Sequence, residues 1–206
     1  ADEAIHQLDI AQMMMGDPPL PKLVNCIAGK KVYHDDRETP DVQVATFEFD
    51  TFILTLELTL YARYIQKTTV TIRRNDILPY WAQNATWVEL YGSEMMMTIG
   101  RHGGGWQVTT SGGKVVEQMY GRPADNPHYQ DFLDAVKSRR KPAADVTIAH
   151  NAAVMIHMAN IAHRLGNTGL TFDPKTQRFV DNDTAQQMIK RVYRKRYQVQ
   201  LLVLRP

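Results

Sequence analysis

An acid, an imidazole and a second acid near the start of the chain are the first residues that could do chemistry. If residues 1–16 form a helix, Asp2, His6, Asp9 and Met13 lie on one side of it at about 100° per residue. Either carboxylate could orient His6, because helical side chains three or four positions apart are neighbours. An imidazole that titrates near neutrality suits proton transfer. The spacing therefore favours a general base with its orienter, and the alternative is a solvated face of a surface helix.

The rest of this segment indicates how such a helix would be held. Ala4, Leu8, Ala11 and Met15 fall on the opposite side and would be buried. The following residues, Gly16 to Pro21, contain a glycine and three prolines, which end helical structure.

The composition excludes several classes of protein. The 206 residues are 44% hydrophobic and can bury a sizeable core. A net charge of +2 from 24 basic and 22 acidic residues gives no strong field for nucleic acid or anionic membrane, and we expect neither partner. Cys26 is the only cysteine, so no intrachain disulfide forms, and we expect a buried thiol in a strand. The sequence has no feature that requires an oxidising compartment and no apolar run long enough to span a bilayer. We therefore expect a cytoplasmic protein.

The middle of the chain has the alternating pattern of an antiparallel sheet. Residues 42–47 and 52–61 predict a hairpin whose second strand places Phe52, Leu54, Leu56, Leu58 and Leu60 on one face. One apolar and one mixed face indicate a sheet covered by helices on one side. Residues 61–74 read as strand-like and residues 75–85 as a loop. We expect about six to eight strands, and the others are predicted at residues 23–33 with a bend at Gly29, 86–91, 95–99, 106–110 and 115–120.

Two stretches invite other chemistry. Asp35, Asp36 and Glu38 could bind a metal ion, but a turn rich in carboxylates between strands is usually solvated, and we expect no metal. Glycines at residues 100–105 could cradle phosphate, but a strand follows them instead of a helix, which favours a turn.

The last part of the chain is predicted to be mainly helical. One helix is predicted to start at Asn126, and a second to run from Thr147 to Leu165. A third is predicted to follow Asp183, which would be its N-terminal cap. An extended segment with an Asp-Pro turn, residues 170–180, separates the last two. The apolar edges are Tyr129, Phe132, Leu133 and Val136 on the first helix, Ile148, Ala152, Met155, Ala159, Ala162 and Leu165 on the second, and Met188, Ile189 and Val192 on the third. His150, His157 and His163 are spaced too widely for a shared ion, so we expect packing or surface histidines.

Several strings together resemble one family. The pattern Asp2-x-x-x-His6-x-x-Asp9-x-Ala11, then an apolar cluster and Gly16-Asp17, resembles the motif that opens the C-terminal domain of the Gfo/Idh/MocA oxidoreductases. This is the family of glucose-fructose oxidoreductase and inositol dehydrogenase. Similar strings follow there in the same order as residues 32–41, 88–94, 132–139 and 159–166 of this chain.

The resemblance implies an α+β fold with a large open, predominantly antiparallel sheet and helices packed on one face. Residues 1–206 would be one C-terminal substrate-binding and oligomerisation domain. Residues 1–16 would form its active-site helix, residues 22–120 its sheet and residues 126–195 its helical part.

The resemblance also implies an NAD(P)-dependent oxidoreductase that acts on a sugar, polyol or related carbohydrate. His6 would exchange the hydroxyl proton, Asp2 would orient or assist it, and Asp9 would support it. NAD or NADP would be bound mainly by an N-terminal Rossmann domain absent from this chain, which would also carry the catalytic lysine of a Glu-Lys-Pro motif. We therefore expect no cofactor-binding residues here, no activity from this chain alone, and a homo-oligomer that uses exposed apolar residues of 52–61.

The chain departs from the family at Gln12 and Met13, where an aromatic residue and an arginine are common. Some members of the family cleave glycosides by redox-assisted chemistry, and others have no catalytic activity. Two alternatives stay open. One is a non-catalytic domain that binds carbohydrate or assembles dimers, and the other is a metal-dependent hydrolase that uses Asp2, His6, Asp9, Asp35 and Asp36.

Overall fold

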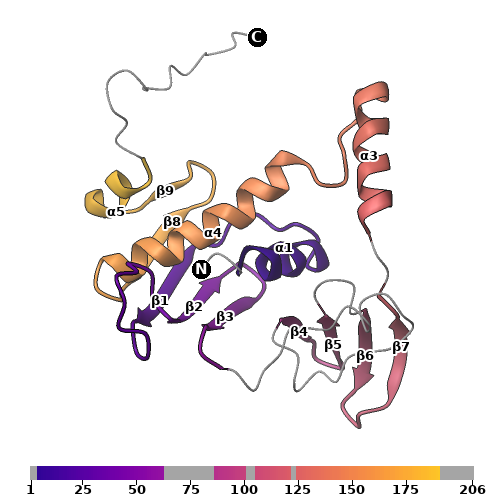
Figure 1. The fold of residues 1–206 in the computed structure, drawn as a ribbon, viewed down its shortest axis with the longest axis horizontal. Helices are drawn as coiled ribbons and strands as arrows, with labels where there is room; N and C mark the ends of the chain where they lie inside the picture. The colour runs from indigo at the N-terminus through magenta and orange to yellow at the C-terminus, as the bar shows by residue number, and fades with distance from the viewer. Residues whose placement is uncertain (1–3, 63–85, 101–104, 122–123, 191–206) are drawn as a thin grey trace.

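The structure, a computed structural model, describes residues 4–62, 86–100, 105–121 and 124–190. These residues form helices and two open antiparallel sheets (Figure 1). The first sheet has the order β3 (Ile53–Thr59), β2 (Val42–Glu48), β1 (Leu23–Gly29), β8 (Gly169–Asp173) and β9 (Arg178–Phe179). The second has the order β4 (Trp87–Tyr91), β5 (Met95–Gly100), β6 (Trp106–Thr110) and β7 (Val115–Met119).

The predicted α+β class with open antiparallel sheets is confirmed. The described strands form two sheets, however, where the sequence predicted one. The chain between β3 and β4 includes the predicted strand-like residues 61–74 and the predicted loop 75–85, and residues 63–85 lie outside the described part.

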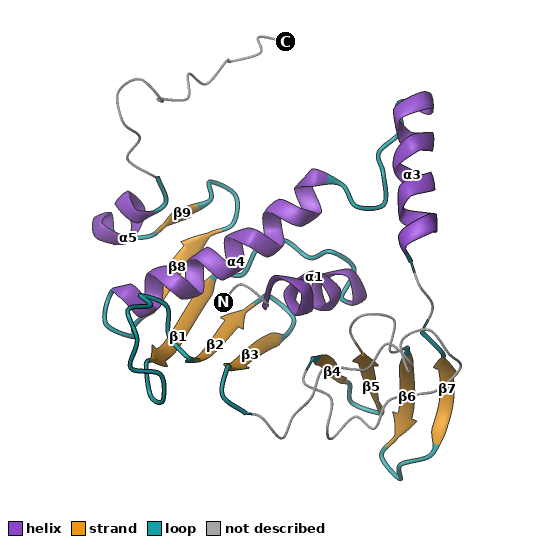
Figure 2. Ribbon diagram, in the orientation of Figure 1, coloured by secondary structure: helices purple, strands orange, loops and turns teal. Residues whose placement is uncertain are grey.

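Two helices, α1 (Ala4–Met14) and α4 (Val146–Arg164), lie side by side on one face of the first sheet (Figure 2). The predicted inward edge of α4 is confirmed at Ala152, Met155 and Ala159, which are fully buried. The Asp145 carboxylate caps α4 by accepting a hydrogen bond from the Thr147 nitrogen, 2.9 Å away. Two other helices are α3 (Asp125–Ser138) and α5 (Asp183–Met188).

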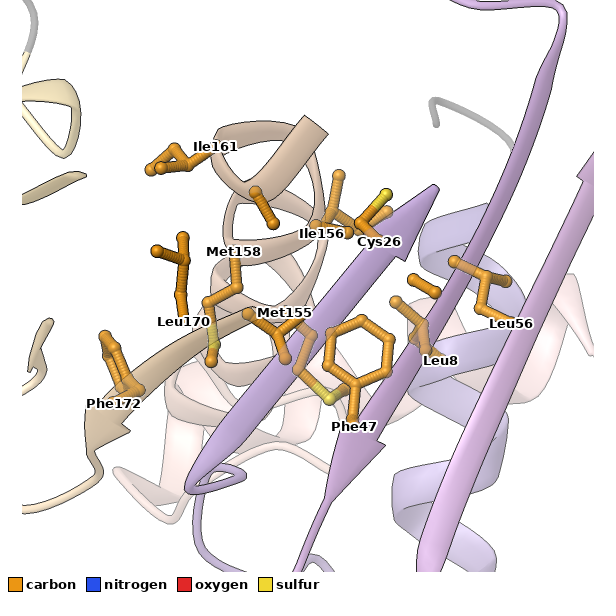
Figure 3. Packing of buried hydrophobic residues seen from close by; sticks show 14 of the residues in the cluster. Leu8, Cys26, Phe47, Leu56, Met155, Ile156, Met158, Ile161, Leu170 and Phe172 are labelled. Carbon is orange, nitrogen blue, oxygen red and sulfur yellow. The ribbon is translucent and has the colours of Figure 1, made fainter. Parts of the chain in front are cut away.

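The core lies between these two helices and the first sheet (Figure 3). Phe47 of β2, Leu8 of α1 and Met155 of α4 are among its fully buried side chains. The predicted hairpin of β2 and β3 is confirmed, with Ala45 opposite Leu56 on the buried face. The other face of this sheet carries no described helix and leaves Ile53 71% exposed.

The prediction that the first strand continues through residues 31–33 is wrong. The strand β1 ends at Gly29, because the Asp41 carboxylate accepts hydrogen bonds from the backbone nitrogens of Lys31, Val32 and Tyr33. These nitrogens therefore bind a side chain and not a neighbouring strand.

Three helix predictions also need correction. The cap of α5 is Asn182 and not Asp183, since the Asn182 side chain accepts a hydrogen bond from the Ala185 nitrogen. Met15 is 38% exposed, because α1 ends at Met14 before the helical spacing would bury it. Of the predicted apolar edge of α5, Ile189 is 42% exposed and Val192 lies outside the described residues.

Within the described residues, no helix has the length and apolarity that spanning a membrane would need.

Candidate functional site

The first helix presents His6 and Asp9 to solvent while its other side is locked in the core. Leu8 is 1% exposed, and Ala4 and Ala11 are also buried against the sheet and α4. His6, Asp9 and Met13 are all exposed, as the spacing predicted. Asp2, the predicted orienter, lies outside the described residues. The structure therefore places an imidazole and one carboxylate on a rigid support.

The end of this helix brings in a carboxylate that the sequence did not single out as a site residue. Gly16 and Asp17 take left-handed φ angles of 79° and 50°. The Asp17 nitrogen donates a hydrogen bond to the Gln12 carbonyl oxygen, 2.8 Å away, which turns the chain back along the helix. The signal in the sequence was Gly16 followed by a short acidic residue that tolerates this conformation.

These neighbours change the protonation of Asp9. Partial burial raises the pKa of the Asp9 carboxyl above its usual value of 3.8, and the negative charge of Asp17 raises it further. His6 acts in the opposite sense, since its positive form favours the Asp9 carboxylate. The three side chains are thus one electrostatic group, in which Asp9 holds a proton more readily than an ordinary aspartate.

Two glutamines of α1 were not predicted as buried polar groups. Gln12 is 2% exposed, and its Oε1 atom and the buried Nε2 atom of Gln7 have no hydrogen-bond partner among the described residues. Buried polar atoms in folded proteins are nearly always hydrogen-bonded. Each such unpaired atom is therefore a local cost to the fold.

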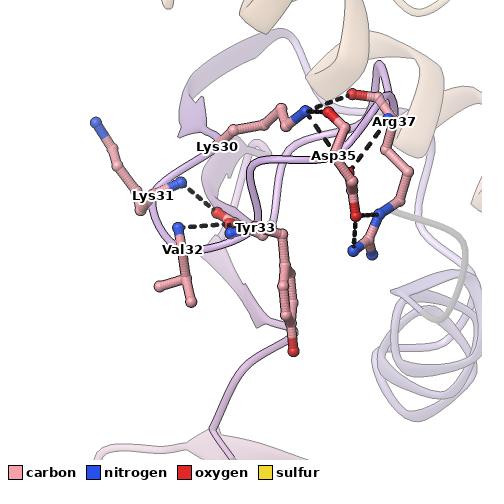
Figure 4. Close-up of polar contacts among 7 residues, drawn as sticks. Lys30, Lys31, Val32, Tyr33, Asp35 and Arg37 are labelled. Atoms are coloured by element: carbon pink, nitrogen blue, oxygen red, sulfur yellow. Dashed lines mark hydrogen bonds and ion pairs between the residues drawn. The ribbon is translucent and has the colours of Figure 1, made fainter.

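In the loop between β1 and β2, carboxylates bind other groups of the same loop (Figure 4). Asp35 forms an ion pair with Arg37, whose Nε atom donates to the Asp35 Oδ2 atom at 2.7 Å. This hydrogen bond lowers the pKa of Asp35 to about 2. The Lys30 ammonium donates to the backbone oxygens of Asp35 and Arg37. Among the described residues no three His, Cys, Asp or Glu side chains gather as a metal ion would require.

Gly100 and Gly105 lie where β5 ends and β6 begins. The Gly100 nitrogen donates to the Gly105 carbonyl oxygen at 2.9 Å, which joins the ends of β5 and β6. Gly105 has a φ of 74°, and a Cβ atom there would lie 2.2 Å from the Met119 carbonyl oxygen. Gly105 is therefore needed for close backbone packing, and residues 101–104 lie outside the described part.

Two of the three histidines of α4 make hydrogen bonds with residues that follow the helix. His150 Nε2 pairs with Gln177 Oε1 at 3.0 Å, His163 Nδ1 pairs with Asn167 Oδ1 at 2.8 Å, and His157 is exposed. His150 and His163 thus connect α4 to the residues that follow it in the chain.

Comparison with known proteins agrees with this architecture. A family model described as "Oxidoreductase family, C-terminal alpha/beta domain" matches residues 105–199. No curated protein matches the chain.

Solved structures with the same fold cover most of the chain. The aldose-aldose oxidoreductase from Caulobacter crescentus, complexed with glycerol, has a TM-score of 0.59 and 13% identity over 82% of this chain and 46% of its own. The UDP-N-acetylglucosamine 3-dehydrogenase GnnA from Acidithiobacillus ferrooxidans has a TM-score of 0.52 and 14% identity over 76% of this chain and 44% of its own. The chain thus spans about half the length of these proteins. Residues 105–199, a little under half of the chain, are thus similar to the C-terminal domain of the Gfo/Idh/MocA oxidoreductases, and the solved structures share the fold of the chain.

Proposed function

We propose that this chain is the substrate-side part of an NAD(P)-dependent oxidoreductase that acts on a sugar, a polyol or a related carbohydrate. The observation that carries the proposal is the exposed imidazole of His6 beside Asp9 on a helix fixed by buried Leu8. Two proteins of the same fold are named as enzymes of sugars, an aldose-aldose oxidoreductase and a UDP-N-acetylglucosamine 3-dehydrogenase.

In this proposal His6 is the proton acceptor. The nicotinamide cofactor, when bound, would supply hydride transfer at the carbon that carries the hydroxyl group. His6 would receive the hydroxyl proton, because its imidazole is solvent-exposed and imidazoles are common general bases. Asp9 would stabilise the imidazolium that forms, since opposite charges on neighbouring turns attract. Asp2, which lies outside the described residues, is proposed to orient the ring.

The described residues suit the reacting end of a nicotinamide cofactor better than its phosphates. Met13 is 58% exposed on the side of α1 that carries His6 and Asp9, and its thioether offers an apolar contact for a flat ring. A pyrophosphate is normally held at a glycine-rich turn that opens a helix. None of the described helices begins at such a turn. The nucleotide would therefore be held by another part of the protein, and either NAD or NADP fits.

The proposal is tested by His6→Ala in the longer protein that joins this chain to a nucleotide-binding domain. We expect turnover of a sugar or polyol substrate to fall about 10²-fold or more, while NADH binding, followed by fluorescence, stays unchanged. The matched control is His157→Ala, which removes another exposed imidazole, on α4. Unchanged turnover in His6→Ala would remove His6 from the mechanism.

A second candidate function, assembly of subunits, is favoured by the open face of the first sheet. Ile27 of β1 and Val44 of β2 are opposite each other in the strand register and are 71% and 39% exposed there, and Ile53 at the start of β3 is 71% exposed on the same face. Adjacent exposed aliphatic side chains on a sheet face are typical of protein interfaces. Sedimentation velocity of Ile27→Lys against wild type tests this function, and an unchanged sedimentation coefficient would contradict it.

A further inference from the structure

The helix α3 carries an apolar stripe that nothing in the described structure covers. Its four large apolar side chains are all about half exposed or more: Tyr129 at 62%, Phe132 at 58%, Leu133 at 51% and Val136 at 48%. Ala135 is the only buried residue of this helix. The helix stands away from both sheets (Figure 1). The i, i+3, i+4, i+7 spacing of these residues is the pattern of a helix that packs against a partner surface.

We propose that this stripe is the surface on which the nucleotide-binding half of the longer protein docks. The inference rests on the proposed function, because that function requires such a half. It goes further in assigning the contact to α3, which the catalytic argument does not use.

The residues that follow α3 are attached to the helix by the Asp131 carboxylate. The Asp131 Oδ1 atom lies 2.6 Å from Arg140 Nη2, and its Oδ2 atom accepts a hydrogen bond from the Ala143 nitrogen at 2.7 Å. These contacts fold the connection to α4 back against α3. The residues beside the stripe are thus held by contacts with α3, and a partner would not have to order them.

The size of the stripe favours a partner in the same polypeptide over a second copy of the chain. Four half-exposed apolar side chains offer roughly 400 Å². A stable complex between separate molecules buries about 800 Å² on each partner. A covalently linked partner needs less area, because the link raises its effective concentration. The solved structures of this fold are about twice as long as this chain, which leaves a half of similar size to cover α3.

The charges beside the stripe indicate what the docking surface carries. Lys137, Arg139 and Lys141 are exposed at the C-terminal end of α3 and in the residues that follow it. An apolar surface with acidic residues at one edge would therefore match this helix.

Hydrogen–deuterium exchange of the α3 amides tests the proposal by comparing the 206-residue chain with the longer protein. In the wild-type longer protein we expect exchange in residues 125–138 to be about tenfold slower or more than in the chain alone. Phe132→Glu should restore fast exchange in the longer protein, because a charge would enter the contact. The matched control is Val146→Glu, which places the same charge on another exposed apolar residue and should keep the slow exchange.

Equal exchange of α3 in the wild-type chain and the wild-type longer protein would overturn the proposal without any variant. Slow exchange in the chain alone that depends on concentration and disappears in Phe132→Glu would also overturn it, in favour of a second copy. NADH binding, measured by fluorescence on the same samples, separates the two proposals. Protected α3 without NADH binding would support docking and overturn the proposed function, and NADH binding without protection would do the reverse.

Discussion

The Asn167 side chain accepts a hydrogen bond through Oδ1 from the backbone nitrogen of Ala28, 2.9 Å away and 139 positions earlier in the chain. The same oxygen lies 2.8 Å from His163 Nδ1. Because the Ala28 nitrogen can only donate, the amide orientation is fixed, and Nδ1 of His163 must carry a proton. Asn167 thus joins the end of α4 to the last residues of β1. It has a left-handed φ of 61°.

Replacing Asn167 separates the two contributions of this residue. Asn167→Gly keeps the left-handed backbone but loses the acceptor, so we expect a loss of about 1 kcal/mol in the free energy of unfolding. Asn167→Ala also places a Cβ atom in this conformation, so we expect a loss of about 2 kcal/mol. Urea unfolding at pH 7 measures both. Equal losses in the two variants would contradict the contribution of the backbone.

Asp41 organises the loop between β1 and β2, and its charge should make the stability of the protein depend on pH. Burial alone would raise its pKa, but hydrogen bonds from the Tyr33, Val32 and Lys31 nitrogens, at 2.7 to 2.8 Å, outweigh burial and lower the pKa to about 2. A lowered pKa means that the folded state favours the carboxylate. This stabilisation is complete above the unfolded pKa of 3.8 and is lost as the pH falls through about 2.

We therefore expect Asp41→Asn to lower the melting temperature at pH 7, because an uncharged amide cannot accept from all three nitrogens as strongly and would turn a donor toward them. The difference from wild type should shrink as the pH falls from 4 to 2. Thermal unfolding at several pH values gives the result. Asp36→Asn, which removes an exposed carboxylate of the same loop, is the control and should melt like wild type. A constant difference across this pH range would show that the Asp41 charge is unimportant.

Much of the fold could be predicted because its signals are local. Alternation of apolar residues identified the hairpin of β2 and β3, and helical spacing identified the buried edge of α4. The exposed side of α1 with His6 and Asp9 followed from the same periodicity. In each case neighbours within one element determine which side is buried.

Polar residues that become buried could not be predicted in this way, because their partners lie far away in the sequence. Gln43 is fully buried, and its Nε2 atom donates to Cys26 Sγ at 3.3 Å and to Asn160 Oδ1 at 3.4 Å. Nothing around Gln43 in the sequence indicates these contacts. The burial of Cys26 was predicted and is confirmed, and burial raises the pKa of its thiol.

The protonation of Asp9 leads to the last prediction. Burial raises the pKa of Asp9 above 3.8, Asp17 raises it further, and His6 opposes both. A raised pKa means that the folded state binds this proton more tightly than the unfolded state, so stability falls as the pH rises from about 3.8 through the folded pKa. Above that pH the ionised carboxylate destabilises the fold by a constant amount.

Asp9→Asn should therefore be more stable than wild type at pH 7, by less than about 1 kcal/mol because Asp9 is exposed and screened by solvent. At pH 3 the two proteins should have the same stability. Urea unfolding at both pH values measures the effect, and Asp17→Asn should reproduce part of the gain at pH 7, since it removes the like charge. Both gains should shrink in about 0.5 M salt. Lower stability of Asp9→Asn at pH 7 would mean that attraction to His6 outweighs burial and the charge of Asp17.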